Sequence, residues 1–275
     1  MQKLLLLGDE AIALGAIDAG LSGMYGYPGT PSTEIMEYIQ SSEEAESLSI
    51  HREWSANEKT ALEAALGMSY TGNRAMVAMK HVGLNVAADP CINSAVTGIN
   101  GGLIVVSADD PSMHSSQNEQ DSRFYGKFAY VPVFEPADQQ EAYNMVSDAF
   151  ELSEKYRLPV MMRITTRLAH SRAAVVRKQK EPQKPFRLPS DPRQFVLLPA
   201  IARRKYSALL TAYESLKFEN RLSRYNIFRD GRNRKLGVIA CGIAYNYLME
   251  NFPDGGPDFP VLKISACRLT YDLIS

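Results

Sequence analysis

Three polar loops, each after an expected strand, carry the residues that could do chemistry. They are Tyr27 to Ser32, Lys80 to Asn85 and Asp109 to Asp121, all rich in Gly, Pro or hydrogen-bonding side chains. The carboxyl ends of parallel strands meet at one edge of a sheet, where open α/β folds bind their ligands. The three loops together therefore predict a ligand cleft, although each alone would be an ordinary surface connection.

A fourth feature is a carboxylate on the apolar side of a helix expected from Ser55 to Tyr70. Glu58 precedes Ala61 and Leu62 by three and four residues, which places it on the apolar stripe of that helix. Glu63 lies on a different face and is expected to be solvated. A carboxylate in the first turn can also serve as a cap or interact with the helix dipole, and this alternative stays open.

The position of Glu58 suits one kind of proton chemistry. A glutamate in apolar surroundings has a raised pKa and can share a proton with a ring nitrogen. This arrangement stabilises the imino tautomer of an aminopyrimidine, which then removes the proton from a thiazolium carbon and generates an ylid that attacks carbonyl groups. Glu58 is therefore a candidate for activating a cofactor of that type.

The elements that must position these residues alternate between helix and strand, which favours a parallel sheet covered on both faces. Helices are expected at 8–20, 32–40, 55–70, 85–94 and 137–156, and strands at 23–27, 48–52, 75–79, 102–108 and 159–165. The continuous apolar run at 103–106 is typical of a strand that is buried on both faces.

Three parts follow from the change of pattern along the chain. Residues 1–170 form the α/β domain, and the Arg-, Lys-, Gln- and Pro-rich stretch 171–193 is expected to be a linker over the surface. Residues 194–275 then begin a second α/β domain, with a helix at 199–220, a strand at 236–241, a helix at 243–251 and a strand at 261–264. Because that domain has no capping segment, we expect a truncated chain or the product of a split gene.

Composition excludes several classes of protein. With 45% hydrophobic residues and a formal net charge of −1, the chain of 275 residues has a sizeable core and no electrostatic reason to bind nucleic acid or a membrane. The apolar start, residues 1–8, is too short to span a bilayer, and a cytoplasmic protein is expected. Three distant cysteines provide neither a disulfide framework nor a metal knuckle, so no metal site is expected in this chain.

The sequence around these sites resembles a known family. The motifs are Gly26-Tyr27-Pro28-Gly29-Thr30-Pro31-Ser32, the stretch from Glu53 to Lys59, the stretch from Met79 to Pro90, and the stretch from Ala108 to Asp121. In this order they resemble the alpha subunit of the indolepyruvate:ferredoxin oxidoreductases, within the wider 2-oxoacid:ferredoxin oxidoreductase family. The resemblance extends from residue 7 to about residue 172, and more loosely beyond.

The resemblance implies a thiamine diphosphate-binding fold of the pyrimidine type. It also implies oxidative decarboxylation of an aryl 2-oxoacid such as indolepyruvate, with coenzyme A as acyl acceptor and ferredoxin as electron acceptor. Glu58 resembles the glutamate that activates the aminopyrimidine, and Thr30 resembles the threonine near the substrate carbonyl and the cofactor. Further cofactor contacts are expected from Pro28, Gly83 and Asn85.

Three further polar residues lie in the same loops and are our own catalytic candidates: Lys80, His81 and His114. A lysine and a histidine beside a decarboxylation site could neutralise the substrate carboxylate or the enolate that forms after carbon dioxide leaves. The alternative is that the two histidines only hydrogen-bond to loop backbone.

The departures from the family pattern concern the other half of the cofactor site. The family holds the diphosphate and Mg²⁺ with a Gly-Asp-Gly type motif, which this chain lacks, and its Fe4S4 clusters need a cysteine-rich module that three cysteines cannot provide. The expected partners are a second copy of this chain and a beta subunit. Alone, the chain is expected to be inactive, and a truncated scaffold or regulatory relative with the same fold is the alternative function.

Overall fold

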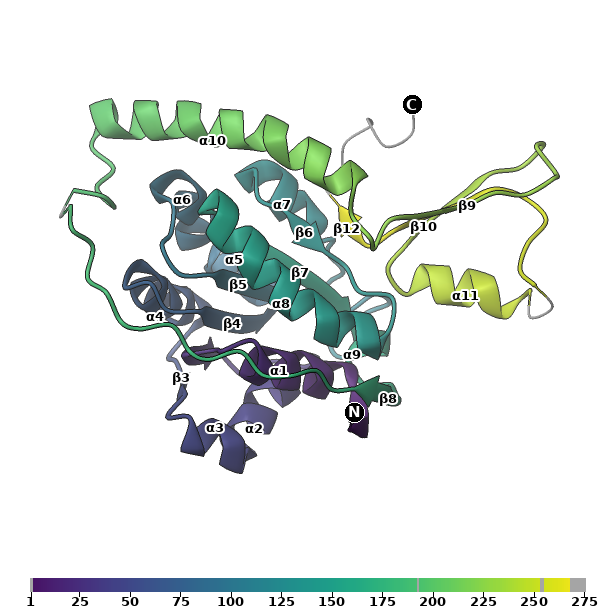
Figure 1. Cartoon of the computed structure of the whole chain (residues 1–275), viewed down its shortest axis with the longest axis horizontal. Coiled ribbons are helices and arrows are strands. Elements are labelled where there is room, and N and C mark those ends of the chain that lie inside the picture. Colours follow the sequence, from purple (N-terminus) through teal and green to yellow (C-terminus); the bar gives the residue numbers. More distant parts are fainter. Residues whose placement is uncertain (1, 192, 253–254, 268–275) are drawn as a thin grey trace.

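A computed structural model describes residues 2–191, 193–252 and 255–267. Its main feature is a seven-stranded sheet of order β12-β6-β7-β5-β4-β2-β3 (Figure 1). Neighbouring strands from β6 to β3 are parallel, and β12 pairs with β6 antiparallel at one edge. The strands are β2 (Gly23–Gly26), β3 (His51–Trp54), β4 (Ala75–Lys80), β5 (Leu103–Asp109), β6 (Val133–Phe134), β7 (Val160–Thr165) and β12 (Ala266–Cys267).

Helices cover both faces of this sheet because its central strands are apolar on both sides. In β4, Met76 faces one core together with α1, α2 and α8, whereas Val77 faces the other core with α4, α5 and α6. These helices are α1 (Gly8–Asp18), α2 (Thr33–Ser41), α4 (Glu58–Tyr70), α5 (His81–Val86), α6 (Ala88–Thr97) and α8 (Gln139–Tyr156). The shorter helices of this part are α3 (Glu43–Ser47), α7 (Arg123–Ala129) and α9 (Thr166–Ala169).

The remaining elements extend this unit and add a smaller one. Strand β1 (Lys3–Leu7) pairs antiparallel with β8 (Arg172–Val176), and α10 (Pro199–Arg221) packs Leu209 and Leu216 against a small core that includes Ala95 of α6 and Ala129 of α7. A three-stranded sheet of β9 (Ile227–Arg229), β10 (Val238–Cys241) and β11 (Val261–Ile264), with α11 (Ala244–Glu250), lies to one side of the large sheet (Figure 1).

The structure confirms the expected parallel α/β sheet and the helix at residue 199. It differs in two places, of which the first concerns the site. Residues 81–86 form helix α5, not a loop, and β8 lies within the stretch expected to be a linker. The domain boundaries themselves stay a prediction, and residues 269–275, the end of the expected second domain, lie outside the described residues.

Among the described helices, none combines the length and the apolar character that crossing a membrane requires.

Candidate functional site

The three polar segments after β2, β4 and β5, called the three loops although His81 begins helix α5, meet through direct hydrogen bonds. Lys80 Nζ donates to the carbonyl oxygen of Ser115 at 2.8 Å, and Ser115 Oγ donates to the carbonyl oxygen of Thr30 at 3.4 Å. The ring nitrogen Nε2 of His81 lies 3.1 Å from the carbonyl oxygen of Asn118. The residues at the carboxyl ends of β2, β4 and β5 therefore lie together, as the sequence predicts, and the ligand cleft expected there stays a prediction.

The first loop is a tight turn that leaves its candidate residues accessible. The Gly29 N–H donates to Thr33 Oγ1 at 3.0 Å, and Ser32 Oγ donates to the Gly29 carbonyl oxygen at 2.8 Å. A Cβ at Gly29 would lie 3.3 Å from Cβ of Lys80, so the turn packs closely on β4. The side chains of Pro28 and Thr30 are exposed and available to a ligand.

Glu58 is the first residue of α4 and is free of the capping role that the sequence left open. Asn57 Oδ1 accepts the Thr60 N–H at 3.0 Å and so caps the helix. The Glu58 carboxylate is half-buried, and within the described ranges it takes part in no hydrogen bond or ion pair. Glu63 is exposed on another face, as expected. The Glu58 carboxylate is thus available to a ligand, while its place in the first turn of α4 keeps the helix-dipole interaction that the sequence also left open.

Gly83 sets the position of that carboxylate. A Cβ at Gly83 would lie 2.4 Å from Oε1 and 2.7 Å from Cδ of Glu58, far inside van der Waals contact. The carboxylate therefore lies directly against the backbone of α5, in space that only glycine leaves open. Two residues further on, Asn85 Oδ1 accepts the hydroxyl proton of Tyr125, which connects α5 to α7.

The two histidine candidates have different surroundings. His81 is completely buried, and its Nε2 contacts loop backbone, which is the structural role that the sequence left open. His114 is exposed, and its backbone N–H hydrogen-bonds to the Asp110 carboxylate. Lys80, half-buried at the end of β4, places its ammonium group beside the third loop.

Asp110 organises the third loop, a role that sequence reasoning missed. Its carboxylate accepts the Ser115 N–H at 2.8 Å and the hydroxyls of Ser116 and Thr166, each at 2.6 Å. Burial raises the pKa of Asp110, but the hydrogen bonds from Ser116, Thr166 and the two backbone N–H groups outweigh it, so the pKa lies well below its ordinary value. Asp110 therefore remains a carboxylate that holds the loop in place.

A buried ion-pair network supports the same edge of the sheet and was also missed. Arg163 Nε donates to Asp109 Oδ2 at 2.6 Å, and its Nη1 donates to Glu135 Oε1 at 2.5 Å. Arg163 is 7% exposed. The available signal was one arginine within the otherwise apolar strand at 160–165, since a buried charge needs partners.

Comparison with known proteins identifies the family of this fold. A family model described as pyruvate flavodoxin/ferredoxin oxidoreductase, thiamine diphosphate binding, matches residues 14–215. The solved 2-oxoglutarate:ferredoxin oxidoreductase from Magnetococcus marinus, with 2-oxoglutarate, coenzyme A and succinyl-CoA bound, superposes with a TM-score of 0.79 at 17% identity, covering 98% of this chain and 55% of that one.

Relatives with curated names agree with this family. Indolepyruvate oxidoreductase subunit IorA from Archaeoglobus fulgidus is 45% identical over 270 residues, which cover 96% of this chain and 43% of the relative. The same subunit from Pyrococcus horikoshii is 46% identical over 255 residues, covering 90% of this chain and 39% of the relative. The 2-oxoglutarate synthase subunit KorA of Methanothermobacter thermautotrophicus is 29% identical over 205 residues, covering 67% of this chain and 52% of the relative.

The chain thus spans about two-fifths of the length of the IorA relatives it matches. The family model covers most of the large α/β unit, including the three strand-end loops and Glu58. The chain belongs to the thiamine diphosphate-binding family of the pyruvate flavodoxin/ferredoxin oxidoreductases, among relatives named indolepyruvate oxidoreductase subunit IorA.

Proposed function

We propose that this chain supplies the aminopyrimidine side of a thiamine diphosphate site in a 2-oxoacid:ferredoxin oxidoreductase of the indolepyruvate type. In the assembled enzyme the reaction is oxidative decarboxylation of an aryl 2-oxoacid to its acyl-CoA, with ferredoxin taking the electrons. The diphosphate, its Mg²⁺ and the iron–sulfur clusters are held by other parts of that assembly, which includes a beta subunit and a second copy of this chain.

The unpartnered carboxylate of Glu58 against Gly83 is the observation that carries this proposal. It fits the pyrimidine side because it is half-buried, is not consumed by capping, and lies beside the edge where the three loops meet. Bound thiamine diphosphate supplies the carbon nucleophile for the 2-oxoacid. Glu58 holds or releases the proton shared with the pyrimidine ring nitrogen, and its half-buried position strengthens that hydrogen bond.

The other cleft residues bind and orient. Thr30 and Pro28, whose side chains are exposed, are assigned contacts with the cofactor and substrate, Gly83 leaves the space that Glu58 occupies, and Asn85 is assigned a cofactor contact. The Lys80 ammonium is the cation that attracts the substrate carboxylate, and His114 adds a polar group at the exposed rim. We assign His81 the role of fastening the third loop rather than contacting substrate.

The test compares two glutamates of one helix in the assembled enzyme. Glu58→Gln removes the exchangeable proton but keeps the size of the side chain, so indolepyruvate-dependent ferredoxin reduction should fall by about 10²–10⁴-fold, the usual contribution of a general acid or base. Glu63→Gln, on the exposed face of α4, should leave the rate within about twofold, as surface changes do. Full activity of Glu58→Gln would contradict the assigned role, and an inactive wild-type assembly would favour the scaffold alternative.

A further inference from the structure

Asp9 is a buried carboxylate that the proposed cleft chemistry does not use. It lies in the first turn of α1, is 0% exposed, and neither of its carboxylate oxygens has a hydrogen-bond partner among the described residues. The neighbouring Glu10 does the capping, since its Oε2 accepts the Leu7 N–H at 2.8 Å. An ionised carboxylate without a partner is costly to bury, so a group that satisfies Asp9 is expected.

A close contact between two helices brings a histidine to Asp9. A Cβ at Gly8 would lie 2.2 Å from the carbonyl oxygen of Leu168, so only glycine lets the start of α1 touch the backbone of α9. His170 follows α9 directly and therefore lies over the first turn of α1. No sequence motif marks this pair, because its two members come from opposite ends of the large α/β unit.

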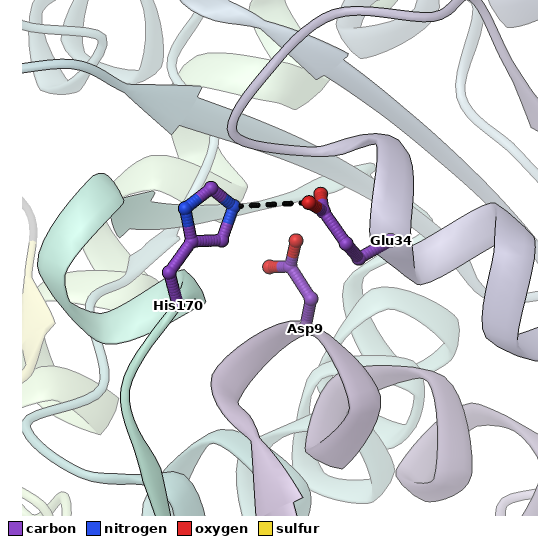
Figure 2. A group of neighbouring side chains, drawn as sticks. All are labelled: Asp9, Glu34 and His170. Atoms are coloured by element: carbon purple, nitrogen blue, oxygen red, sulfur yellow. Dashed lines mark ion pairs between the residues drawn. The ribbon is translucent and has the colours of Figure 1, made fainter. Parts of the chain in front are cut away.

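Helix α2 adds a second carboxylate from its own first turn. Glu34 Oε1 lies 3.3 Å from His170 Nε2, while the other oxygen, Oε2, is buried and has no partner among the described residues. One ligand atom from each of Asp9, Glu34 and His170 can be chosen so that all lie within 4.8 Å of one another. Figure 2 shows the three side chains converging from three separate helical segments.

We propose that Asp9, Glu34 and His170 form a binding site for one divalent transition-metal cation of the Zn²⁺ class. An imidazole nitrogen favours such ions over Mg²⁺ and Ca²⁺, which prefer sites made only of oxygen. Ligand atoms about 2 Å from a tetrahedral zinc lie roughly 3.3 Å apart, close to the separation of the His170 and Glu34 atoms. A divalent cation would also give one of the unpartnered Asp9 oxygens a partner.

The surroundings of the group leave room for a fourth ligand. The side chains of Glu34 and His170 are 33% and 34% exposed, so an ion can enter from solvent and keep one water molecule. Three protein ligands and one water form a common zinc coordination. The bound ion would join the starts of α1 and α2 to the end of α9.

This position connects the metal site to the first and third loops. Thr33, next to Glu34, accepts the Gly29 N–H of the first loop, and Thr166 at the start of α9 donates to Asp110 of the third loop. The ion would therefore help to fix the positions of the first and third loops, which contact α2 and α9. It is separate from the Mg²⁺ of the diphosphate side, for which this chain has no motif.

A shared proton is the competing explanation. Burial and the neighbouring carboxylates of Glu34 and Glu10 raise the pKa of Asp9 well above its ordinary value, so that a protonated Asp9 could donate to Glu34. In that case, Asp9→Asn would be tolerated, because an amide N–H replaces the carboxyl O–H. Zinc binding would then be absent from the wild type as well.

The experiment measures the binding of Zn²⁺ to the full chain, without a histidine tag and after removal of metals with a chelator. Calorimetric titration should show one equivalent bound, and zinc should raise the thermal midpoint. Asp9→Asn should abolish this binding and His170→Gln should weaken it at least tenfold. His170 is one-third exposed, so its variant should fold even if Asp9→Asn does not.

A matched control is available in a second histidine–carboxylate pair. His51 Nε2 lies 3.1 Å from Glu53 Oε2 on strand β3, where both side chains are exposed and the described residues offer no third ligand. His51→Gln should leave zinc binding unchanged. The proposal is wrong if the wild type binds no stoichiometric zinc, if His170→Gln binds it as tightly as the wild type, or if His51→Gln removes it. The readout is independent of thiamine chemistry, so its failure leaves the proposed function standing.

Discussion

Replacing Gly83 by alanine tests whether the position of the Glu58 carboxylate matters for function. The new Cβ would lie 2.4 Å from Glu58 Oε1, so the carboxylate must leave its place against α5. The three nearest atoms to this Cβ all belong to the flexible side chain of Glu58, so that side chain can move instead of the backbone of α5. The substitution therefore displaces a chemical group while leaving the fold intact.

The free energy of unfolding should change little. Alanine in place of a helical glycine stabilises by about 1 kcal/mol, and turning one side chain away from its preferred rotamer costs about 0.5–1.5 kcal/mol. No hydrogen bond is lost, since Glu58 has no partner among the described residues. The two effects nearly cancel, so the thermal midpoint should stay within about 4 °C of the wild type. The rate of 2-oxoacid decarboxylation should nevertheless fall by about 10²-fold or more, as for loss of a general acid or base.

The assay is decarboxylation by the assembled enzyme, with thermal unfolding measured on the same preparations. Gly67→Ala is the matched control, because Gly67 is exposed on the same helix as Glu58 and a Cβ there would meet no atom within 4 Å. That variant should gain stability and keep its activity. If Gly83→Ala keeps full activity at unchanged stability, the placement of Glu58 against Gly83 has no functional importance.

Three further predictions concern buried groups other than Glu58. Asp110→Asn should destabilise the protein by about 1–3 kcal/mol at pH 7. The folded-state pKa of Asp110 is lowered, so the ionised carboxylate stabilises the fold above the unfolded pKa of about 3.9. That stabilisation is lost as the pH falls through the folded-state pKa. Urea unfolding from pH 6 to 3 should therefore show a flatter pH dependence for the variant, and equal slopes would contradict this. Arg163→Met should lower the free energy of unfolding in urea by about 3–5 kcal/mol, because it leaves buried carboxylates without a partner. Arg232→Ala, which removes an exposed ion pair, should lower it by less than about 1 kcal/mol. Similar losses in the two variants would contradict this difference. Complete burial raises the pKa of Cys91 to about 12. Iodoacetamide at pH 8 should therefore label Cys91 only after unfolding, and more slowly than the half-buried Cys241, as mass spectrometry can establish. Rapid labelling of Cys91 in the folded protein would contradict this prediction.

The spacing of apolar residues along the chain predicted those helices and strands whose burial follows a regular local pattern. The apolar run at 103–106 became the central strand β5, and Ala61 and Leu62 of α4 are buried as their spacing predicted, while Glu58 is half-buried. The convergence of the three loops also followed from the sequence, because it depends only on parallel strands that share an edge. These features need no knowledge of distant contacts.

Features that depend on distant contacts could not be predicted in this way. The pairing of β1 with β8 joins the start of the chain to a stretch whose polar composition resembles a linker. Strands β6 and β12 are each two residues long, too short for a periodic pattern. Gly83 lowers the helix propensity of residues 81–86, so the sequence did not predict helix α5. The glycine leaves space for the Glu58 side chain, which can be recognised only when α4 and α5 are packed together.

Exchange of the thiazolium C2 proton of bound thiamine diphosphate is the most direct test of the central claim, that Glu58 activates this cofactor. Nuclear magnetic resonance can measure the exchange rate in deuterated water with the assembled enzyme, before any 2-oxoacid is added. The wild type and Glu63→Gln should exchange this proton at the same rate, and Glu58→Gln should exchange it about 10²-fold more slowly or worse. Equal rates in all three proteins, with the cofactor bound in each, would contradict the role assigned to Glu58.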